Sequence, residues 1–303
     1  MVRAAVSLCG IELDNPVIPA SGTFGYGYTF AELYDIDCLG TFSFKGTTRE
    51  QRLGNAQPRI AEAPGGMLNA VGLQNPGVDA VIAEELPRLK QVFHKPVMAN
   101  VSGFSIEEYV EVCRKFDACE QVGWLEVNIS CPNVHGGGLA FGTDPKAAAS
   151  VTRAVKAAVK KPVIVKLSPN VTSIADIARA CEDAGADAVS LINTVLGMRI
   201  DLRAKRPLLA NKTGGMSGPA IFPLAVRMVK NQNSDHRHGR RDARGRCAGA
   251  DAGRSNGGGG RRGKLGESLC LPRYCPGSSA GNAELQHTES ERYHRRCTPW
   301  VKT

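Results

Sequence analysis

Six short apolar runs of strand length recur along the first 193 residues, and most of them end in a polar residue or glycine. Their Val, Ile, Leu and Ala content is typical of buried β-strands. The runs span residues 16–21, 42–46, 96–100, 124–130, 162–167 and 188–193. Helical patterns separate the later runs, and a strand that returns through a helix pairs in parallel with its neighbour. The chain is therefore predicted to form an α/β fold around a parallel sheet.

The helical stretches carry recognisable start and stop signals. Asp144 followed by Pro145 gives an N-cap and a proline at the first helical position, and the helix continues to Lys160. Residues 106–116 and 173–184 have similar patterns, and another helix begins near Pro219. Six βα units leading into a further helix favour a (β/α)8 TIM barrel over an open sheet. Residues 6–13 are expected to form a small hairpin that closes the bottom of the barrel.

Composition changes sharply after residue 230. Residues 1–230 carry 24 Lys and Arg against 22 Asp and Glu, whereas residues 231–303 carry 14 against 7 and so hold most of the net charge of +9. The second part also has no Ile, Phe or Met, and such a segment cannot bury enough apolar surface to form a core. We therefore expect two regions: a barrel domain over 1–230, with six strands and the start of the next helix, and a disordered Arg/Gly-rich tail over 231–303.

The sequence gives no membrane or metal signal. No apolar run approaches the roughly 18 residues that span a bilayer, and the N-terminal residues lack a signal-peptide core. The ten cysteines are scattered without CxxC pairs, which indicates neither a disulfide framework nor a zinc or iron–sulfur site. A cytoplasmic protein without a bound metal is expected.

The ends of the predicted strands carry polar side chains. In a (β/α) barrel the functional groups lie at the carboxyl ends of the strands. Amides and lysines without an acidic pair favour an anionic ligand rich in hydrogen-bonding groups, and they argue against a glycosidase or a hard-metal site. These side chains are Ser21, Lys45, Asn100, Asn128, Lys166 and Asn193.

The most specific motif is Asn-Ile-Ser-Cys-Pro-Asn at residues 128–133, followed by three glycines at 136–138. It places Cys131 just past a predicted strand, in a loop whose glycines allow a mobile lid. A lone cysteine is more often a small buried thiol. Its place at a strand end raises the alternative that Cys131 is a nucleophile or a general base.

Together with four other motifs, this stretch resembles class 1 dihydroorotate dehydrogenase. The similarity runs nearly without a gap from about residue 5 to residue 230. The other motifs are Pro-Ala-Ser-Gly-Thr-Phe-Gly at 19–25, the Gly-Met-Leu-Asn-Ala-Val-Gly-Leu-Gln-Asn-Pro-Gly stretch at 66–77, Val-Lys-Leu-Ser-Pro-Asn at 165–170 and Gly-Gly-Met-Ser-Gly-Pro-Ala at 214–220.

The resemblance implies an FMN-dependent (β/α) barrel that oxidises dihydroorotate to orotate in pyrimidine synthesis. It implies that Cys131 removes a proton from C5 of the substrate while a hydride leaves C6 for the flavin. A thiolate is a competent base where a lid excludes water. Membrane-associated class 2 enzymes use Ser at this place, so the cysteine favours class 1.

The remaining site residues also follow from the resemblance. It implies substrate contacts from Lys45, Asn69, Ala70, Val71, Gly72, Leu73, Asn128, Asn133, Asn193 and Thr194. It implies FMN contacts from Ser21, Lys45, Gly46, Asn100, Asn128, Lys166, Ile192 and Gly218. Lys166 is expected near the N1/O2 edge of the flavin, where a positive charge stabilises the reduced ring.

Within class 1, residues 193–201 and 206–211 resemble the NAD-linked type B more than the fumarate-linked type A. The type B resemblance implies a homodimer that pairs with a second subunit. That subunit carries FAD and a 2Fe–2S cluster, through which electrons reach NAD.

The resemblance stops where the family continues with strands seven and eight, which hold the FMN phosphate. No such strand is evident at residues 236–242, His-Arg-His-Gly-Arg-Arg-Asp. Codons for these residues, read one base later, permit Ile-Gly-Met-Gly-Gly-Val, the expected strand with its glycines. The same offset over 249–260 permits Ala-Leu-Met-Leu-Ala-Gly-Ala-Met-Ala-Val-Gly. A frameshift within residues 230–235 is therefore predicted, and the chain as written is expected to lack strands seven and eight and to bind FMN poorly.

Two alternatives remain open at this point. The basic tail is a candidate nucleic-acid arm, since Arg/Gly runs bind phosphate backbones non-specifically, although its three aromatic residues are not interleaved with the basic cluster. Nucleic acid is therefore the less favoured partner. A related FMN barrel acting on another dihydropyrimidine would suit the same set of asparagines.

Overall fold

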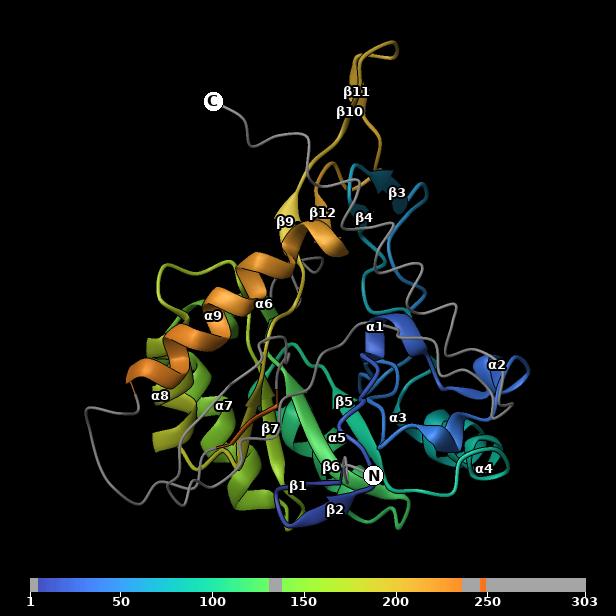
Figure 1. Cartoon of the computed structure of the whole chain (residues 1–303), viewed down its shortest axis with the longest axis vertical. Coiled ribbons are helices and arrows are strands. Elements are labelled where there is room, and N and C mark those ends of the chain that lie inside the picture. Colours follow the sequence, from blue (N-terminus) through green and yellow to red (C-terminus); the bar gives the residue numbers. More distant parts are fainter. Residues whose placement is uncertain (1–4, 131–137, 236–245, 249–303) are drawn as a thin grey trace, which may run out of the picture.

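The computed structural model describes residues 5–130, 138–235 and 246–248 (Figure 1). A parallel sheet forms its centre, with strands in the order β13-β8-β7-β6-β5. The strands are β5 (Val97–Val101), β6 (Val122–Asn128), β7 (Val163–Lys166), β8 (Ala188–Ser190) and β13 (Arg246–Ala248). Four of the six predicted strands are therefore confirmed as regular strands.

The first two predicted runs, residues 16–21 and 42–46, are not regular strands. Residues 42–47 still lie parallel to β5, through isolated bridges from Ser43 to Met98 and from Thr47 to Val101. Hydrogen bonds from Gly40 and Ser43 to the carbonyls of Val17 and Pro19 place the first run on the far side. Prolines 16 and 19 lack an N–H, so a continuous ladder is not possible there. Both runs thus extend the curved sheet beyond β5 without regular pairing.

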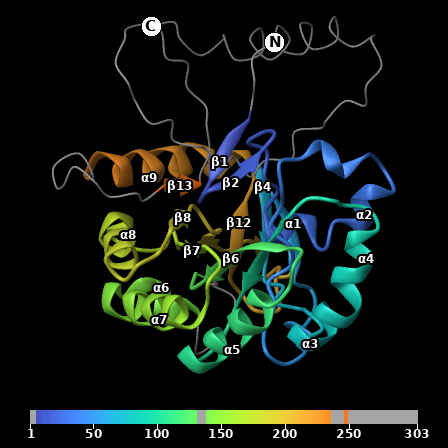
Figure 2. The same ribbon diagram turned by 90° about the horizontal axis from the view of Figure 1, so that it is seen from below.

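Helices enclose the strands on the outside, as Figure 2 shows from below. The predicted helices are confirmed as α5 (Ile106–Asp117), α7 (Pro145–Ala158), α8 (Ile174–Asp183) and α9 (Phe222–Asp235), the last preceded by the 3₁₀ turn η3 (Pro219–Ile221). Each of α5, α7 and α8 begins at the expected kind of cap: the side chains of Ser105, Asp144 and Ser173 accept backbone N–H groups of the first turn.

The remaining helices are short. They are α1 (Ser21–Phe24), α2 (Tyr28–Ala31), η1 (Ile36–Cys38), α3 (Val78–Ala80), the π-helical η2 (Val81–Glu85), α4 (Leu86–Lys90) and α6 (Gly138–Thr143). The three residues of α3 lead directly into η2, and η2 leads directly into α4. Residues 78–90 therefore make one continuous helical stretch.

The strands separate two apolar layers. From Met98 and Trp124 onward, the odd-numbered residues of β5 to β8 face the helices and belong to the main hydrophobic core, which includes Val101, Val127 and Val165. Val122 also belongs to this core, at the point where the register between β5 and β6 is irregular. Even-numbered residues near the start of each strand face inward and form a second cluster with residues of the N-terminal hairpin. The inward members are Met98, Trp124, Ile164 and Ala188.

The predicted hairpin closes this inner layer from below. Strands β1 (Val6–Leu8) and β2 (Ile11–Leu13) pair antiparallel around Cys9 and Gly10, which have φ of 50° and 87°. Positive φ at both central residues matches a hairpin turn whose twist suits the strands. The indole Nε1 of Trp124 donates to the Leu8 carbonyl at 3.1 Å. The apolar layer is therefore sealed at the amino ends of the strands.

A second, antiparallel sheet stands at the other end of the molecule (Figure 1). Its strand order is β3-β4-β12-β9, and a two-stranded hairpin of β10 and β11 projects beyond it. The bounds are β3 (Ile60–Ala63), β4 (Gly66–Asn69), β9 (Val195–Gly197), β10 (Ile200–Asp201), β11 (Arg206–Pro207) and β12 (Gly214–Ser217). The strand pattern of the sequence did not predict this sheet.

The region after residue 230 departs from expectation in two respects. Helix α9 continues to Asp235, across the expected domain boundary. We expected no seventh strand, but three residues form one: β13 pairs in parallel with β8, from Arg246↔Ala188 to Ala248↔Ser190. The exposed edge of β8 offers unpaired N–H and C=O groups to any extended segment that follows α9. The place of an eighth strand lies outside the described residues, as does nearly all of the expected tail.

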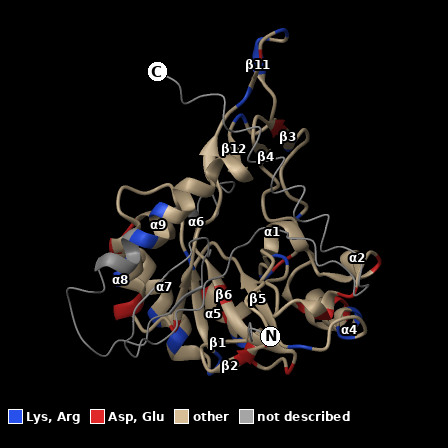
Figure 3. Cartoon of the chain, in the orientation of Figure 1, with Lys and Arg blue, Asp and Glu red and all other residues tan. Residues whose placement is uncertain are grey.

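Charged side chains of both signs lie on the outer helices, for example on α4 and α8, and on the projecting hairpin (Figure 3). Within the described ranges, no helix is long and apolar enough to cross a membrane.

Candidate functional site

A polar layer lies directly above the apolar inner layer of the barrel. It is formed by the next inward-facing positions of the same strands, in register as Asn100↔Glu126 and Lys166↔Ser190. The carboxylate of Glu126 lies at its centre and accepts hydrogen bonds from Ser43 Oγ at 2.7 Å, Asn100 Nδ2 at 2.6 Å and Ser190 Oγ at 2.7 Å. Four separate strand segments thus meet at one buried side chain.

The environment of Glu126 keeps its carboxyl ionised. Burial by itself raises the pKa of this group, but the positive charge of Lys166 and the three hydrogen bonds outweigh burial and hold the pKa below its ordinary value. Sequence reasoning missed Glu126 because it lies in mid-strand, away from the strand ends. The signal was present: it is the one charged residue in an otherwise uncharged run, two positions before Asn128 and therefore on the same face.

Asn128 joins the predicted strand-end residues into one network. Its Oδ1 accepts from Ser130 Oγ at 2.8 Å and from Asn193 Nδ2 at 3.3 Å, and its Nδ2 donates to Asn100 Oδ1 at 3.5 Å. Asn193 Nδ2 also donates to Ser130 Oγ at 2.8 Å. The structure therefore brings Asn100, Asn128 and Asn193 together, as the positions of their strands predicted.

Lys45 and Gly46 lie beside this network, at the end of the segment that runs along β5. A Cβ at Gly46 would lie only 2.8 Å from Asn100 Oδ1, so the backbone there is in close contact and leaves no room for a side chain. The Oγ of Ser102, just past β5, is buried and has no hydrogen-bond partner in the described part of the chain. A backbone without a side chain lets a planar ligand approach closely, and an unpaired buried hydroxyl can hydrogen-bond to it. Both features therefore suit a planar, hydrogen-bonding ligand.

The loop after β4 approaches from the second sheet. Asn69 ends β4, and its Nδ2 donates to the Gly215 carbonyl of β12 at 3.4 Å. Ala70 is buried, Val71 binds Asn55 through its carbonyl, and Gly72 and Leu73 have positive φ of 77° and 58°. A Cβ at Gly215 would overlap the Thr194 side chain. Strand β12 therefore links the 69–73 loop to Thr194, the neighbour of Asn193.

The other predicted contacts are placed less directly. Ser21 is buried at the start of α1, and Ile192 packs against the outer core. Gly218 has a φ of 114° and its nearest neighbours are Gly66 and Gly65 in the second sheet. Within the described ranges, no hydrogen bond joins these three residues to the Asn128 network. Cys131 and Asn133 lie outside the described residues, although Ser130, which precedes them, is buried and hydrogen-bonded to Asn128.

These side chains fit the ring of a flavin. Amide groups supply donors and acceptors for its pyrimidine edge, and Lys166 supplies a cation at the mouth of the barrel. The expected phosphate-binding strand ends lie in the part of the chain that is not described. Among the described residues, no group of three His, Cys, Asp or Glu is placed to hold a metal ion.

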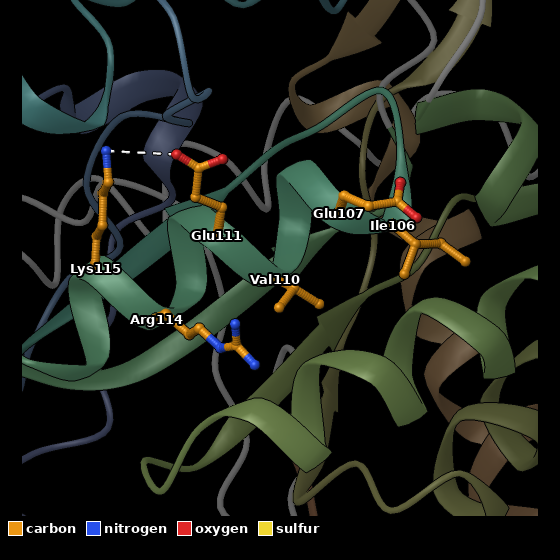
Figure 4. Close-up of a pocket in the computed structure, with 6 residues that line it drawn as sticks. All are labelled: Ile106, Glu107, Val110, Glu111, Arg114 and Lys115. Carbon is orange, nitrogen blue, oxygen red and sulfur yellow. Dashed lines mark ion pairs between the residues drawn. The ribbon is translucent and has the colours of Figure 1, made fainter.

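A hollow of about 560 Å³ lies on the outside of the barrel and is distinct from this site (Figure 4). All of its lining residues belong to α5: Ile106, Glu107, Val110, Glu111, Arg114 and Lys115. Lys115 pairs with Glu111 at 3.6 Å and with Asp79 at 2.8 Å. Two of its charged side chains, Lys115 and Glu111, therefore form ion pairs on the outer surface.

A (β/α) barrel with lysine and asparagine side chains gathered at its strand ends suits the class of flavin-binding oxidoreductases. Residues 3–237 match the family model for dihydroorotate dehydrogenase. The chain belongs to the dihydroorotate dehydrogenase family.

Curated relatives give the subtype. This chain is 56% identical to a Bacillus cytotoxicus protein over 229 residues, which are 76% of this chain and 74% of the relative. It is 57% identical over 229 residues to an Anoxybacillus flavithermus protein (76% and 73%) and 55% identical over 226 residues to an Enterococcus faecalis protein (75% and 72%). Each relative is named dihydroorotate dehydrogenase B (NAD(+)), catalytic subunit.

Proposed function

We propose that this chain oxidises (S)-dihydroorotate to orotate as the catalytic subunit of an NAD-linked, type B enzyme of pyrimidine (UMP) biosynthesis in the cytoplasm. The carrying observation is the Asn100–Asn128–Asn193 network at the strand ends. It lies within the stretch that is similar to the type B relatives. An amide-rich pocket suits an imide ring, whose N–H and C=O groups need matched partners.

FMN is the proposed cofactor, and it supplies the acceptor for the hydride that leaves C6 of the substrate. The residues proposed to hold it are Ser21, Lys45, Gly46, Asn100, Asn128, Lys166, Ile192 and Gly218. Support comes from the close backbone at Gly46, the orphaned Ser102 hydroxyl and the inward-facing Lys166.

The substrate is proposed to lie between this cofactor site and the 69–73 loop. Lys45 binds its carboxylate as a cation, and amides from Asn69, Asn128, Asn133 and Asn193, with the Thr194 hydroxyl, satisfy the ring. The contact of β12 with both Asn69 and Thr194 supports one pocket rather than two.

Cys131 is the proposed base. Its thiolate takes the proton from C5 as the C6–H bond breaks, and the electron pair of the C5–H bond forms the C5=C6 double bond of orotate. A cysteine in a loop that excludes water is competent for this transfer.

The base assignment predicts the behaviour of Cys131→Ser. A serine hydroxyl is a far weaker base near neutral pH, so in a chain whose reading frame is restored after residue 230, flavin reduction by dihydroorotate should slow by about 100-fold or more while FMN stays bound. Stopped-flow absorbance of the bound flavin measures the rate. The matched control is Cys119→Ser, because Cys119 is a half-buried cysteine that lies just past the end of α5. An unchanged rate in Cys131→Ser would refute the assignment of Cys131 as the base. Faster flavin reduction by dihydrouracil than by dihydroorotate would show that dihydroorotate is not the substrate.

The proposed assembly is a homodimer that binds a second subunit carrying FAD and a 2Fe–2S cluster. Support comes from the relatives, which are named catalytic subunits of an NAD(+)-linked enzyme. Reduction of NAD by dihydroorotate should require both subunits. Equal NAD reduction by this chain alone would contradict the proposed electron path.

We further propose that the reading frame shifts within residues 230–235 and that the residues after this point do not supply the family's strands seven and eight, although α9 ends at Asp235 and the three residues of β13 pair with β8. The family match ends at residue 237, and about a quarter of the Bacillus cytotoxicus relative has no counterpart in the aligned stretch. Resequencing the coding DNA across residues 230–236 is the direct test. An unshifted sequence, together with a flavin absorbance band in the purified chain, would overturn the proposal.

A further inference from the structure

Four strands of the central sheet, β5 to β8, carry two charged side chains between them. These are Glu126 and Lys166. Lys166 is in register with Asn128 on one side and with Ser190 on the other, and Glu126 lies on the same face of β6 as Asn128. The inward-facing positions of these four strands therefore hold one carboxylate and one ammonium group, whose charges are opposite.

Glu126 is buried, with 4% of its surface exposed, and is held from three directions. Oε2 accepts from Ser43 Oγ and Asn100 Nδ2, and Oε1 accepts from Ser190 Oγ. A carboxylate has about four acceptor positions, so these three donors leave capacity for one more. The positive charge of Lys166 further favours the ionised form of the carboxyl and lowers its pKa.

The charge of Lys166 acts on Glu126 from the neighbouring strand. Lys166 is in register with Asn128, which lies two positions after Glu126 on the same face of β6. Lys166 is partly exposed, whereas Glu126 is buried, and a buried charge is costly without a compensating one nearby. Asn100 is held directly, because one end of its amide donates to Glu126 while the other accepts from Asn128. Glu126 is thus bonded to an amide and lies near a cation, both of which face the proposed flavin.

We propose that Glu126 is a positioning residue, which orients the Asn100 amide toward the flavin ring and, from the neighbouring strand, limits the positive potential that Lys166 presents to it. The inference rests on the proposed function in one respect, namely that the bound ring is FMN. Glu126 itself lies one layer below the strand ends and does not touch the substrate.

The first test compares the affinities of the full chain for oxidised and reduced FMN. Glu126→Gln keeps the shape of the side chain and removes its charge, which leaves Lys166 uncompensated. The variant should favour reduced over oxidised FMN by about tenfold more than the parent chain, a rise of about 30 mV in the two-electron potential. Redox titration against a reference dye measures this value. Ser190→Ala, which removes one neutral donor, is the control and should shift the ratio by less than twofold.

Two results of this test would overturn the inference. An unchanged ratio in Glu126→Gln would show that its charge does not reach the flavin. Equal shifts in Glu126→Gln and Ser190→Ala would show that only packing is involved.

The second test needs no flavin. Urea unfolding of the parent chain, Glu126→Gln, Lys166→Met and the double variant gives a thermodynamic cycle. The coupling between the two residues should change the unfolding equilibrium by at least tenfold, and the double variant should be more stable than the sum of the single effects implies. Additive effects would overturn the inference. If Glu126→Gln does not fold, recovery of folding in the double variant supports the pair, and failure to recover counts against it.

The two tests separate the inference from the proposed function. If neither the parent chain nor any variant binds FMN, the proposed function fails for this chain. The unfolding cycle alone then decides whether the charges of Glu126 and Lys166 are coupled.

Discussion

At the scale of single residues, the site depends on polar groups that are buried with their partners. Asn128 uses both ends of its amide, toward Asn100 on one side and toward Ser130 and Asn193 on the other. A buried amide left without such partners costs about 1–3 kcal/mol, so each group fixes the orientation of the next. The orientation that the ligand meets is therefore set before it binds.

Glu126 makes this residue-scale order sensitive to acid. Its folded-state pKa lies below the ordinary 4.5, so its contribution to the free energy of unfolding is fully present above about pH 4.5 and is lost as the pH falls through the folded pKa. Lys166 is the charged group that faces it, and Ser43, Asn100 and Ser190 do not titrate in this range. Urea midpoints measured between pH 6 and pH 3 should fall more steeply for the parent chain than for Glu126→Gln. Parallel curves would contradict this assignment.

At the scale of elements, the N-terminal hairpin closes the barrel. Leu8 and Leu13 pack on the inward-facing Met98, Trp124 and Ile164, at the amino ends of three strands. The hairpin is too short to be stable alone, so it is ordered by this packing. In turn it seals the apolar layer on which the polar site rests.

The hairpin prediction concerns Leu13→Ala. Leu13 is 3% exposed, and its truncation removes buried methyl groups and leaves a cavity, so the free energy of unfolding should fall by about 2–5 kcal/mol. Chemical denaturation measures the change. Glu12→Ala, on the exposed side of the same strand, should change stability by less than about 0.5 kcal/mol. A loss of similar size in both variants would show that the hairpin does not plug the barrel.

At the scale of the whole molecule, closure of the sheet decides whether the cofactor stays bound. Strand β8 is bordered by only three residues of β13, and α9 leads into residues that match no family position beyond 237. An eight-stranded barrel has no open edge, whereas a partial barrel exposes one. The proposed ring-binding residues Asn100, Asn128 and Lys166 lie on β5, β6 and β7, whereas the expected phosphate-binding strand ends fall outside the described residues.

Restoring the reading frame after residue 230 should therefore have a large effect. We expect the restored chain to bind FMN at least 100-fold more tightly than the chain as written, because the phosphate regains its backbone N–H donors and the barrel its last strands. Fluorescence quenching of FMN on titration gives both dissociation constants. A restored chain with added Gly→Ala changes at the phosphate-binding glycines is the control and should lose most of the gain. Equal affinities of the restored and original chains would contradict the frame assignment.

Much of the fold could be predicted from local sequence. The helices from 106, 145 and 174 follow capping residues and apolar periodicity, and the hairpin follows Cys9-Gly10 between two short apolar runs. The second sheet could not be predicted, because β3, β4, β9 and β12 have at most four residues each. Strands this short are specified by their partners rather than by their own pattern.

The sequence by itself determined the order of the parallel strands β5 to β8 and of the helices between them, the polar residues at the strand ends and, through its motifs, the family. Only the tertiary structure decided which of those residues meet. Glu126, 83 positions from Ser43 and 64 from Ser190, becomes their common acceptor because the sheet curves and brings their strands around one axis. Hydrogen bonds over such separations depend on closure of the chain, which no local pattern encodes.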